Sequence, residues 1–156
     1  MGLQLKPMFI SDMAKYMSMM EGFCKIGTLA WNNNNPGNLD AGPRAKGKDA
    51  RGYAIYDKIS EGWADLEDLI VGILTKHPTL TLRTFFGGER DANGDVLPGG
   101  YPGYAPEADP RGANQPSTYA TYIGGQLKIP IDDVLASYLP PLTPDNPTKG
   151  QQQDVG

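Results

Sequence analysis

The segment SEGWADLEDLIVGILTKHP, residues 60–78, carries the strongest helical pattern in the 156-residue chain. Its apolar side chains recur every three or four positions, which predicts one buried helical face. Ser60 offers an N-cap oxygen, Glu61 gives an acidic first turn, and His77-Pro78 closes the segment. We therefore expect a central buried helix here, with its apolar face formed by Trp63, Leu66, Ile70, Ile73 and Leu74.

Weaker patterns on either side predict a mostly helical α+β fold. Residues 11–23 begin with the N-cap candidates Ser11 and Asp12, and their methionines fall at helical spacing, which is typical of core packing. Residues 52–56 read as one short strand between a glycine and a charged turn. We also expect helices at 80–86 and 117–127, a last helix capped by Asp132, a small β-region near 39–57, and a binding or mobile loop at 87–116.

Composition and charge narrow the classes of partner. The formal net charge is −4, which argues against a nucleic-acid backbone as partner. One cysteine can form no intrachain disulfide, and one cysteine with one histidine argues against a zinc site, so we expect no metal or other cofactor. The longest apolar run is too short to cross a bilayer, so we expect no membrane insertion.

The length of the chain fits one domain, which we expect to cover residues 1–142. Residues 143–156 are polar and rich in proline, and they can bury too little surface to offset the entropy of ordering. This segment is therefore expected to be a flexible tail. The N-terminus lacks the basic and apolar regions of a signal peptide, so we expect synthesis in the cytoplasm.

Glu21 is the first residue that could carry chemistry. It follows Met17 by four positions, which places it beside the apolar face of the first helix, at that helix's last turn. Desolvation and the helix dipole would both raise the pKa of its carboxyl. A carboxylic acid that stays protonated near neutral pH can donate a proton to the leaving oxygen of a glycosidic bond. The alternative is an ordinary solvated residue at a helix end.

The run Trp31-Asn32-Asn33-Asn34-Asn35-Pro36-Gly37-Asn38-Leu39 places five asparagines around a Pro-Gly turn. Each amide offers both donors and acceptors, as sugar hydroxyls and N-acetyl groups require, and Trp31 adds a flat apolar face for a pyranose ring. The alternative is a turn whose Asn side chains bond their own backbone. The glycan-binding interpretation assigns the contacts to Trp31, Asn33, Asn34, Asn35 and Asn38.

Three blocks of the chain together resemble a known family. Met20-Glu21-Gly22-Phe23, a spacer at 27–30 and the Asn-Pro-Gly run at 33–39 are similar to the "EGF … NNNPGNL" signature of small phage and bacterial proteins assigned to the lysozyme-like superfamily. The pair 52–56 and 61–66 resembles that family's strand and "GW-x-AL" helix. Tyr104-Ala105-Pro106 with residues 114–119 resembles its "YAP … NNP-x-x-Y" segment, so the likeness extends over about residues 11–139.

The resemblance implies a lysozyme-like domain that cleaves the glycan strands of bacterial peptidoglycan. Glu21 would correspond to the single catalytic Glu of goose-type lysozymes and lytic transglycosylases, and Tyr104 and Tyr119 would line the saccharide cleft with the asparagine run. The protein would then act at the cell wall, either as part of a phage virion or after export by another route. It would also contact other virion proteins if it belongs to a virion. Two positions depart from the family pattern: Trp31 stands where Arg is frequent, and Cys24 where many members have an aromatic or other residue.

The resemblance leaves open whether a second carboxylate takes part. A retaining lysozyme needs one about 5 Å from the first and an inverting enzyme one about 6.5–9.5 Å away. In the lytic-transglycosylase route the substrate's N-acetyl group assists, and one Glu acts as acid and then as base. The single prominent Glu fits that route slightly better, with the hydrolase alternatives resting on Asp40, Asp49, Asp57, Glu107 and Asp109.

Three rival interpretations remain. Cys24 and His77 could pair as in a cysteine peptidase, but Cys24 follows a helix C-terminus, which does not stabilise a thiolate. Residues 91–95 open like a calcium loop, but Val96 occupies the required Gly position, so a turn at Asn93-Gly94 is favoured. The third is a non-catalytic virion structural or cell-wall-binding protein that keeps a lysozyme-like fold.

Overall fold

The computed structural model describes residues 9–107 and 114–139, which divide into two compact units. Residues 9–72 form the N-terminal unit, and residues 73–107 with 114–139 form the C-terminal unit. The fold is mostly helical with one small antiparallel sheet, as the sequence predicts. The expectation of a single domain over 1–142 stays a prediction, and the tail at 143–156 lies outside the described residues.

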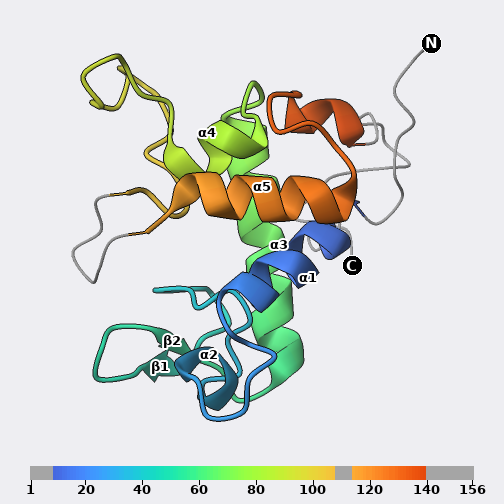
Figure 1. The fold of residues 1–156 in the computed structure, drawn as a ribbon. Coiled ribbons are helices and arrows are strands. Elements are labelled where there is room, and N and C mark those ends of the chain that lie inside the picture. The colour runs from blue at the N-terminus through green and yellow to red at the C-terminus, as the bar shows by residue number, and fades with distance from the viewer. Residues whose placement is uncertain (1–8, 108–113, 140–156) are drawn as a thin grey trace, which may run out of the picture. The chain divides into compact units, whose positions relative to one another are not determined.

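The N-terminal unit holds α1 (Phe9–Met20), α2 (Leu29–Asn32), the two strands and most of α3 (Ile59–Lys76) (Figure 1). Strands β1 (Gly47–Lys48) and β2 (Ala54–Ile55) pair antiparallel, with Gly47 opposite Ile55. The strand predicted at 52–56 is thus confirmed in a shorter form. The buried apolar side chains of the unit come from α1, α3 and the loops around the sheet: Phe9, Met13, Met17, Leu39, Tyr56, Leu66 and Ile70.

Helix α1 begins earlier than the sequence suggests. It starts at Phe9, so Ser11 and Asp12 lie in its first turn and the prediction that they form the N-cap is wrong. Phe9 is itself buried, and its burial extends the helix beyond the polar cap signal. The helix ends in a Schellman motif, because Gly22 N–H donates to Met19 O (3.2 Å), Phe23 N–H donates to Ser18 O (3.0 Å), and Gly22 has φ +79°.

Helix α3 has the predicted extent and end but a different cap. Ser60 lies inside the helix, so its assignment as N-cap is wrong. The backbone N–H of Lys58 instead donates to Glu61 Oε1 at 3.0 Å, which is the acidic half of a capping box. The helix closes at Lys76, directly before His77-Pro78, and His77 N–H donates to Ile73 O at 2.8 Å.

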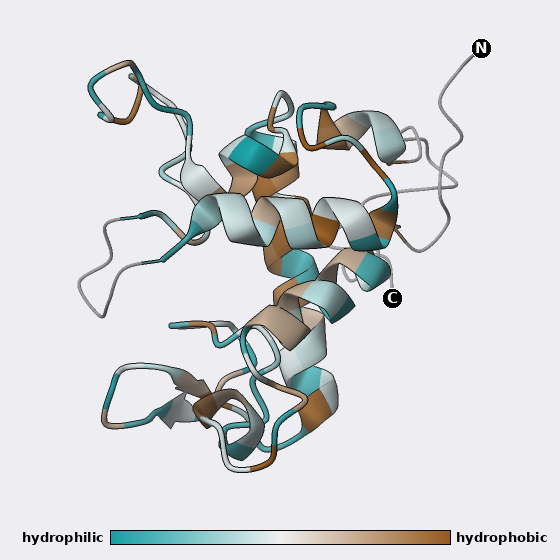
Figure 2. Cartoon of the chain, in the orientation of Figure 1, coloured by the Kyte–Doolittle hydropathy of each residue, from teal (hydrophilic) through white to brown (hydrophobic). Residues whose placement is uncertain are grey.

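The C-terminal unit packs α4 (Leu82–Gly87) against α5 (Pro116–Leu127), followed by a 3-10 helix, η1 (Leu135–Tyr138). Apolar and polar segments alternate along α5 in Figure 2, and its buried side is formed by Ala120, Ile123, Gly124 and Leu127. The two α-helices match the segments predicted at 80–86 and 117–127. The described part of the chain contains no helix long and apolar enough to span a membrane.

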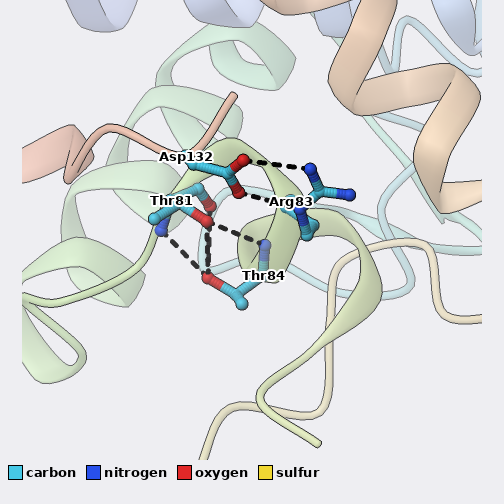
Figure 3. A network of polar contacts seen from close by, with 4 residues as sticks. All are labelled: Thr81, Arg83, Thr84 and Asp132. Carbon is cyan, nitrogen blue, oxygen red and sulfur yellow. Dashed lines mark hydrogen bonds and ion pairs between the residues drawn. The ribbon is translucent and has the colours of Figure 1, made fainter. Parts of the chain in front are cut away.

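Asp132 does not cap a helix, and that prediction is wrong. Its carboxylate accepts two hydrogen bonds from the Arg83 guanidinium, at 2.8 and 3.0 Å (Figure 3). Arg83 belongs to α4, whose start is closed by a reciprocal capping box between Thr81 and Thr84. The bidentate pair therefore joins the start of α4 to the segment before η1. Helix η1 itself has no side-chain cap.

Residues 88–103 form an ordered arm in the C-terminal unit, drawn yellow in Figure 1. The Arg90 guanidinium donates to the carbonyl oxygens of Gly87, Gly94 and Pro102, each at 2.8 Å. The predicted turn at Asn93-Gly94 is confirmed, since Gly94 has φ +86° and its N–H donates to Asp91 O at 3.0 Å. No group of three or more His, Cys, Asp or Glu among the described residues could hold a metal ion.

Candidate functional site

Glu21 is the C-cap residue of α1. Its N–H donates to Met17 O at 3.1 Å, and Gly22 directly after it turns the chain with a positive φ. The Glu21 side chain is half-buried. The negative end of the helix dipole acts against a negative charge placed there. The backbone thus places Glu21 at the last turn of α1, as the sequence predicts, and the position of its carboxyl beside the methionine face stays a prediction.

Three aromatic rings, two of them within ten residues of Glu21 in the sequence, form a continuous group. The Phe23 ring lies 5.9 Å from that of Trp31 and meets the Trp63 ring edge-on at 5.6 Å. Trp31 is 41% exposed, so part of its side chain remains accessible to a ligand. The sequence indicated Trp31 but not Phe23, and it assigned Trp63 to the core alone. The signal that would have found Phe23 is its place two residues after Glu21.

Thr28 joins the turn that follows Glu21 to the start of α2. Its hydroxyl lies within hydrogen-bonding distance of Gly22 O (2.8 Å) and Lys25 O (2.9 Å), and it accepts from Trp31 N–H (3.3 Å). One side chain therefore fixes the backbone beside Glu21 and caps the helix that carries Trp31. The carboxyl and the aromatic face belong to one tied segment, residues 21–31.

The asparagine run divides into buried supports and a half-exposed remainder. Asn35 is 0% exposed; its Nδ2 donates to Leu39 O and Ala54 O, and its Oδ1 accepts from Leu39 N–H. Asn33 is also buried, and its Nδ2 donates to Asp49 Oδ2 at 2.8 Å. Asn34 donates to Tyr56 O at 3.0 Å. These amides hold the loop to its neighbours. Asn35 bonds the backbone of its own turn, as the alternative interpretation has it, whereas Asn33 and Asn34 bond residues outside the turn.

Asn38 is half-exposed like Asn34, and both have a left-handed φ, 50° at Asn38 and 51° at Asn34. Asn38 differs in its buried Oδ1, which accepts no hydrogen bond within the part of the chain that the structure describes. Asn tolerates this backbone region better than most residues because its short polar side chain can bond locally. Of the four asparagines assigned to glycan contact, Asn38 and the half-exposed Asn34 are thus the two with surface for a ligand.

Two glycines let the asparagine run press against α3. A Cβ on Gly62 would lie 2.2 Å from Asn34 O, and one on Gly37 would lie 2.7 Å from Leu66 Cδ1. These distances leave no room for a side chain at either position. The tight fit explains why Pro36 and Gly37 are buried although they belong to a turn.

A buried ionic network supports the β-region and was not found by sequence reasoning. The Asp65 carboxylate, on α3, accepts from the Arg44 guanidinium, from Arg44 N–H (3.1 Å) and from Tyr56 Oη (3.0 Å). Burial and then the Asp65 carboxylate raise the pKa of Tyr56 above its usual range. A Cβ on Gly42 would lie 2.1 Å from Asp65 Oδ2, so the carboxylate is closely enclosed. We assign this network to structure, since its carboxylate is used internally.

The candidates for a second carboxylate have different surroundings. Asp49 accepts from the backbone N–H groups of Tyr53 and Arg51 and from Asn33, and these bonds, that of Tyr53 foremost, hold its pKa below the usual value. Asp57 pairs with Lys46 at 2.8 Å on an exposed surface. Asp40 is exposed, as is Glu107 in the C-terminal unit, and Asp109 lies outside the described residues.

Tyr104 and Tyr119 come together in the C-terminal unit. Both rings contact Phe86, with centroids 6.0 Å and 5.4 Å away, and Tyr104 also stacks on Phe85 at 5.9 Å. Both tyrosines are half-buried. The fold thus brings the two tyrosines together around a buried phenylalanine of α4, and their role in lining a saccharide cleft stays a prediction.

The components of the peptidase alternative have separate surroundings. Cys24 is exposed and follows the C-terminal end of α1, so it has no helix N-terminus to stabilise a thiolate. His77 closes α3; its Nδ1 lies 3.7 Å from Glu89 Oε1 and its ring 5.4 Å from that of Tyr101. Cys24 belongs to the N-terminal unit and His77 to the C-terminal unit.

Comparison with known proteins gives no match: no family model, curated protein or solved structure matches this chain.

Proposed function

We propose that this protein cleaves the glycan strands of bacterial peptidoglycan at the β-1,4 bond between MurNAc and GlcNAc, with Glu21 as the acid. The observation that carries the proposal is the position of Glu21. It caps the C-terminal end of α1, half-buried, in the same tied segment as the exposed Trp31 face. A helix C-terminus disfavours a negative charge, which supports a carboxyl that donates a proton.

The aromatic group supplies the surface on which a sugar can lie. Trp31 is partly exposed, and its ring contacts that of Phe23, which in turn contacts Trp63. A pyranose ring presents an apolar face of C–H groups, and aromatic side chains offer large apolar contact area with few rotatable bonds. Binding of the strand at this face would bring a glycosidic oxygen toward the turn that holds Glu21.

The chemistry that fits one acid best is the transglycosylase route. The substrate's N-acetyl group assists departure of the leaving oxygen, which Glu21 protonates. The same Glu21 carboxylate then accepts the proton of the 6-hydroxyl as the 1,6-anhydro ring closes, so no water is consumed. Asp49 is a weaker alternative as a second carboxylate than an exposed aspartate such as Asp40, because its oxygens already accept from Asn33, Arg51 and Tyr53.

The test is the release of soluble fragments from purified peptidoglycan, compared with heat-killed protein, followed by mass spectrometry of the products. We expect fragments that end in 1,6-anhydro-MurNAc, lighter by one water than hydrolysed ends. Reducing MurNAc ends throughout would make the protein a hydrolase and direct the search for a partner to Asp49, Asp40 and Asp57. No release above the control would contradict the proposal.

One observation favours a second candidate function, a non-catalytic cell-wall-binding or virion structural protein. The amides of Asn33 and Asn35 donate hydrogen bonds to groups within the protein, so these two asparagines stabilise the fold and do not contact a ligand. In that case the exposed Trp31 face would serve recognition alone. Cosedimentation with peptidoglycan that depends on Trp31, without release of fragments, would identify this function.

A further inference from the structure

Thr28 contacts the turn after Glu21 with both branches of its side chain. Its Oγ1 lies 2.8 Å from Gly22 O, and its Cγ2 lies 3.5 Å from the place that a Cβ on Gly22 would take. The two residues are six positions apart, so one half-buried side chain closes the intervening segment into a loop. The path of the backbone directly after Glu21 is therefore held by a residue that lies outside α1.

The same hydroxyl supports the start of α2. It accepts from Trp31 N–H at 3.3 Å, and Thr28 has the extended backbone of an N-cap residue. Helix α2 contains four residues, and so short a helix is not stable without support from outside it. One oxygen atom thus contacts both the turn that follows Glu21 and the helix that carries Trp31.

Two kinds of contact join the Glu21 turn to Trp31. The rings of Phe23 and Trp31 meet at 5.9 Å, tilted by 42°. Such apolar contact is non-directional, so by itself it lets one ring slide over the other. The bonds of the Thr28 hydroxyl are directional, at 2.8 Å to Gly22 O and 3.3 Å from Trp31 N–H. The hydroxyl is therefore the contact that can fix how the Trp31 ring lies relative to the Glu21 turn.

We propose that Thr28 is a positioning residue for the cleavage reaction: its hydroxyl holds the Trp31 ring and the Glu21 turn in one geometry. This role rests on the proposed function and requires no contact between Thr28 and the substrate. A sugar on Trp31 presents its glycosidic oxygen to Glu21 only when the two are held at a fixed separation, and a misplacement of about 1 Å can cost a factor of about 10² in rate. Loss of the hydroxyl should therefore lower turnover although the residues that touch the glycan remain.

The test removes the hydroxyl and keeps the shape of the side chain. Thr28→Val should lower turnover of purified peptidoglycan about tenfold to a hundredfold, whereas Thr28→Ser, which keeps the hydroxyl, should retain most of it. Thr81→Val is the matched control, because Thr81 caps α4 by accepting from Thr84 N–H at 3.2 Å in the C-terminal unit. It should keep wild-type turnover. Unchanged turnover in Thr28→Val, or an equal fall in Thr81→Val, would overturn the role of Thr28.

A double-mutant cycle with Trp31→Ala separates positioning from a general loss of stability. If the hydroxyl acts through Trp31, Thr28→Val should lower turnover much less in the Trp31→Ala background than in the wild type. Equal falls in both backgrounds would leave Thr28 a structural residue and overturn the proposal. Thr28→Ser and Thr28→Ala form a second pair that differs by the hydroxyl alone, and Thr28→Ser should be the more active of the two even if Thr28→Val does not fold.

Failure of the positioning role is distinguishable from failure of the proposed function. Wild-type protein that releases no fragments would contradict the function and, with it, the role of Thr28. Release by the wild type, with equal turnover in Thr28→Ser and Thr28→Ala, would contradict the positioning role alone.

Discussion

Two neighbouring segments of the N-terminal unit differ in which kind of side chain they bury and which kind they expose. The asparagine run at 33–39 is polar, yet Asn33 and Asn35 are buried and donate to groups within the protein. The turn at 21–28 is partly apolar, yet it leaves Ile26 open to solvent. From residue type alone, one would expect the asparagines to be exposed and the isoleucine to be buried. Polar composition is therefore a poor guide to ligand contact. A better guide is whether a polar group already has a hydrogen-bond partner within the protein.

The largest effect should come from removing a support of the asparagine run. Asn35→Ala deletes three hydrogen bonds, so Leu39 N–H loses its acceptor and Ala54 O loses the amide donor, whereas Leu39 O keeps the N–H of Ala54. We expect the free energy of unfolding to fall by about 2–4 kcal/mol, measured by chemical denaturation. Asn32→Ala is the control: Asn32 is exposed with one bond of 3.3 Å to Gly27 O, and the loss should stay below about 1 kcal/mol. Equal losses would remove the distinction between the two kinds of asparagine.

A smaller effect, on binding instead of stability, should follow from Trp31→Ala. The exposed face of Trp31 is the surface assigned to the sugar, so affinity for peptidoglycan should fall about tenfold in a cosedimentation assay. Stability should change by about 1 kcal/mol or less, because Trp31 is 41% exposed. Val134→Ala, at an equally exposed apolar residue of the C-terminal unit, provides the control. Undiminished binding in Trp31→Ala would mean that the glycan contacts another surface.

The smallest effect concerns Asp49, which accepts a hydrogen bond from Asn33, and its contribution to stability at acid pH. The pKa of Asp49 is lowered from its ordinary 3.8, with the Tyr53 N–H as the first cause and the Asn33 amide as the second. A lowered pKa means that the carboxylate contributes stability above its ordinary pKa and loses it as the pH falls through the folded-state value. Asp49→Asn should therefore show a shallower loss of stability below about pH 4 than the wild type. Parallel acid-unfolding curves would contradict this role of Asp49.

Much of the fold follows from local patterns in the sequence. The three-to-four spacing of apolar residues predicted α3, α4 and α5, and the closing signal at His77-Pro78 was correct. The residues that were expected to begin helices were less reliable, because a neighbouring residue can form the hydrogen bonds to the backbone N–H groups at a helix start. Glu61 caps Lys58 N–H although Ser60 is the better cap by type, and burial of Phe9 extends α1 past Ser11.

The candidate site was predictable only in part. Glu21 and Trp31 could be identified from spacing and residue type, since helix-end position and aromatic character are local properties. The direction of each asparagine amide depends on partners such as Asp49, 16 residues from Asn33, and Ala54, 19 residues from Asn35. The pairing of Arg44 with Asp65 spans 21 residues and has no local signal at all. Such long-range bonds are decided by packing, which a pattern in one sequence does not encode.

The most direct test of the central claim is the rate of peptidoglycan cleavage by Glu21→Gln. The substitution keeps the size of the side chain and removes the transferable proton, so turnover should fall by about 10²–10⁴, since general acid catalysis is worth that factor. Glu67→Gln, the same change at a half-buried position on α3, is the matched control and should keep wild-type turnover. We expect the Glu21→Gln protein to fold and to bind peptidoglycan, but not to release fragments from it. Retention of more than about a tenth of wild-type turnover by that variant would contradict the assignment of Glu21 as the acid.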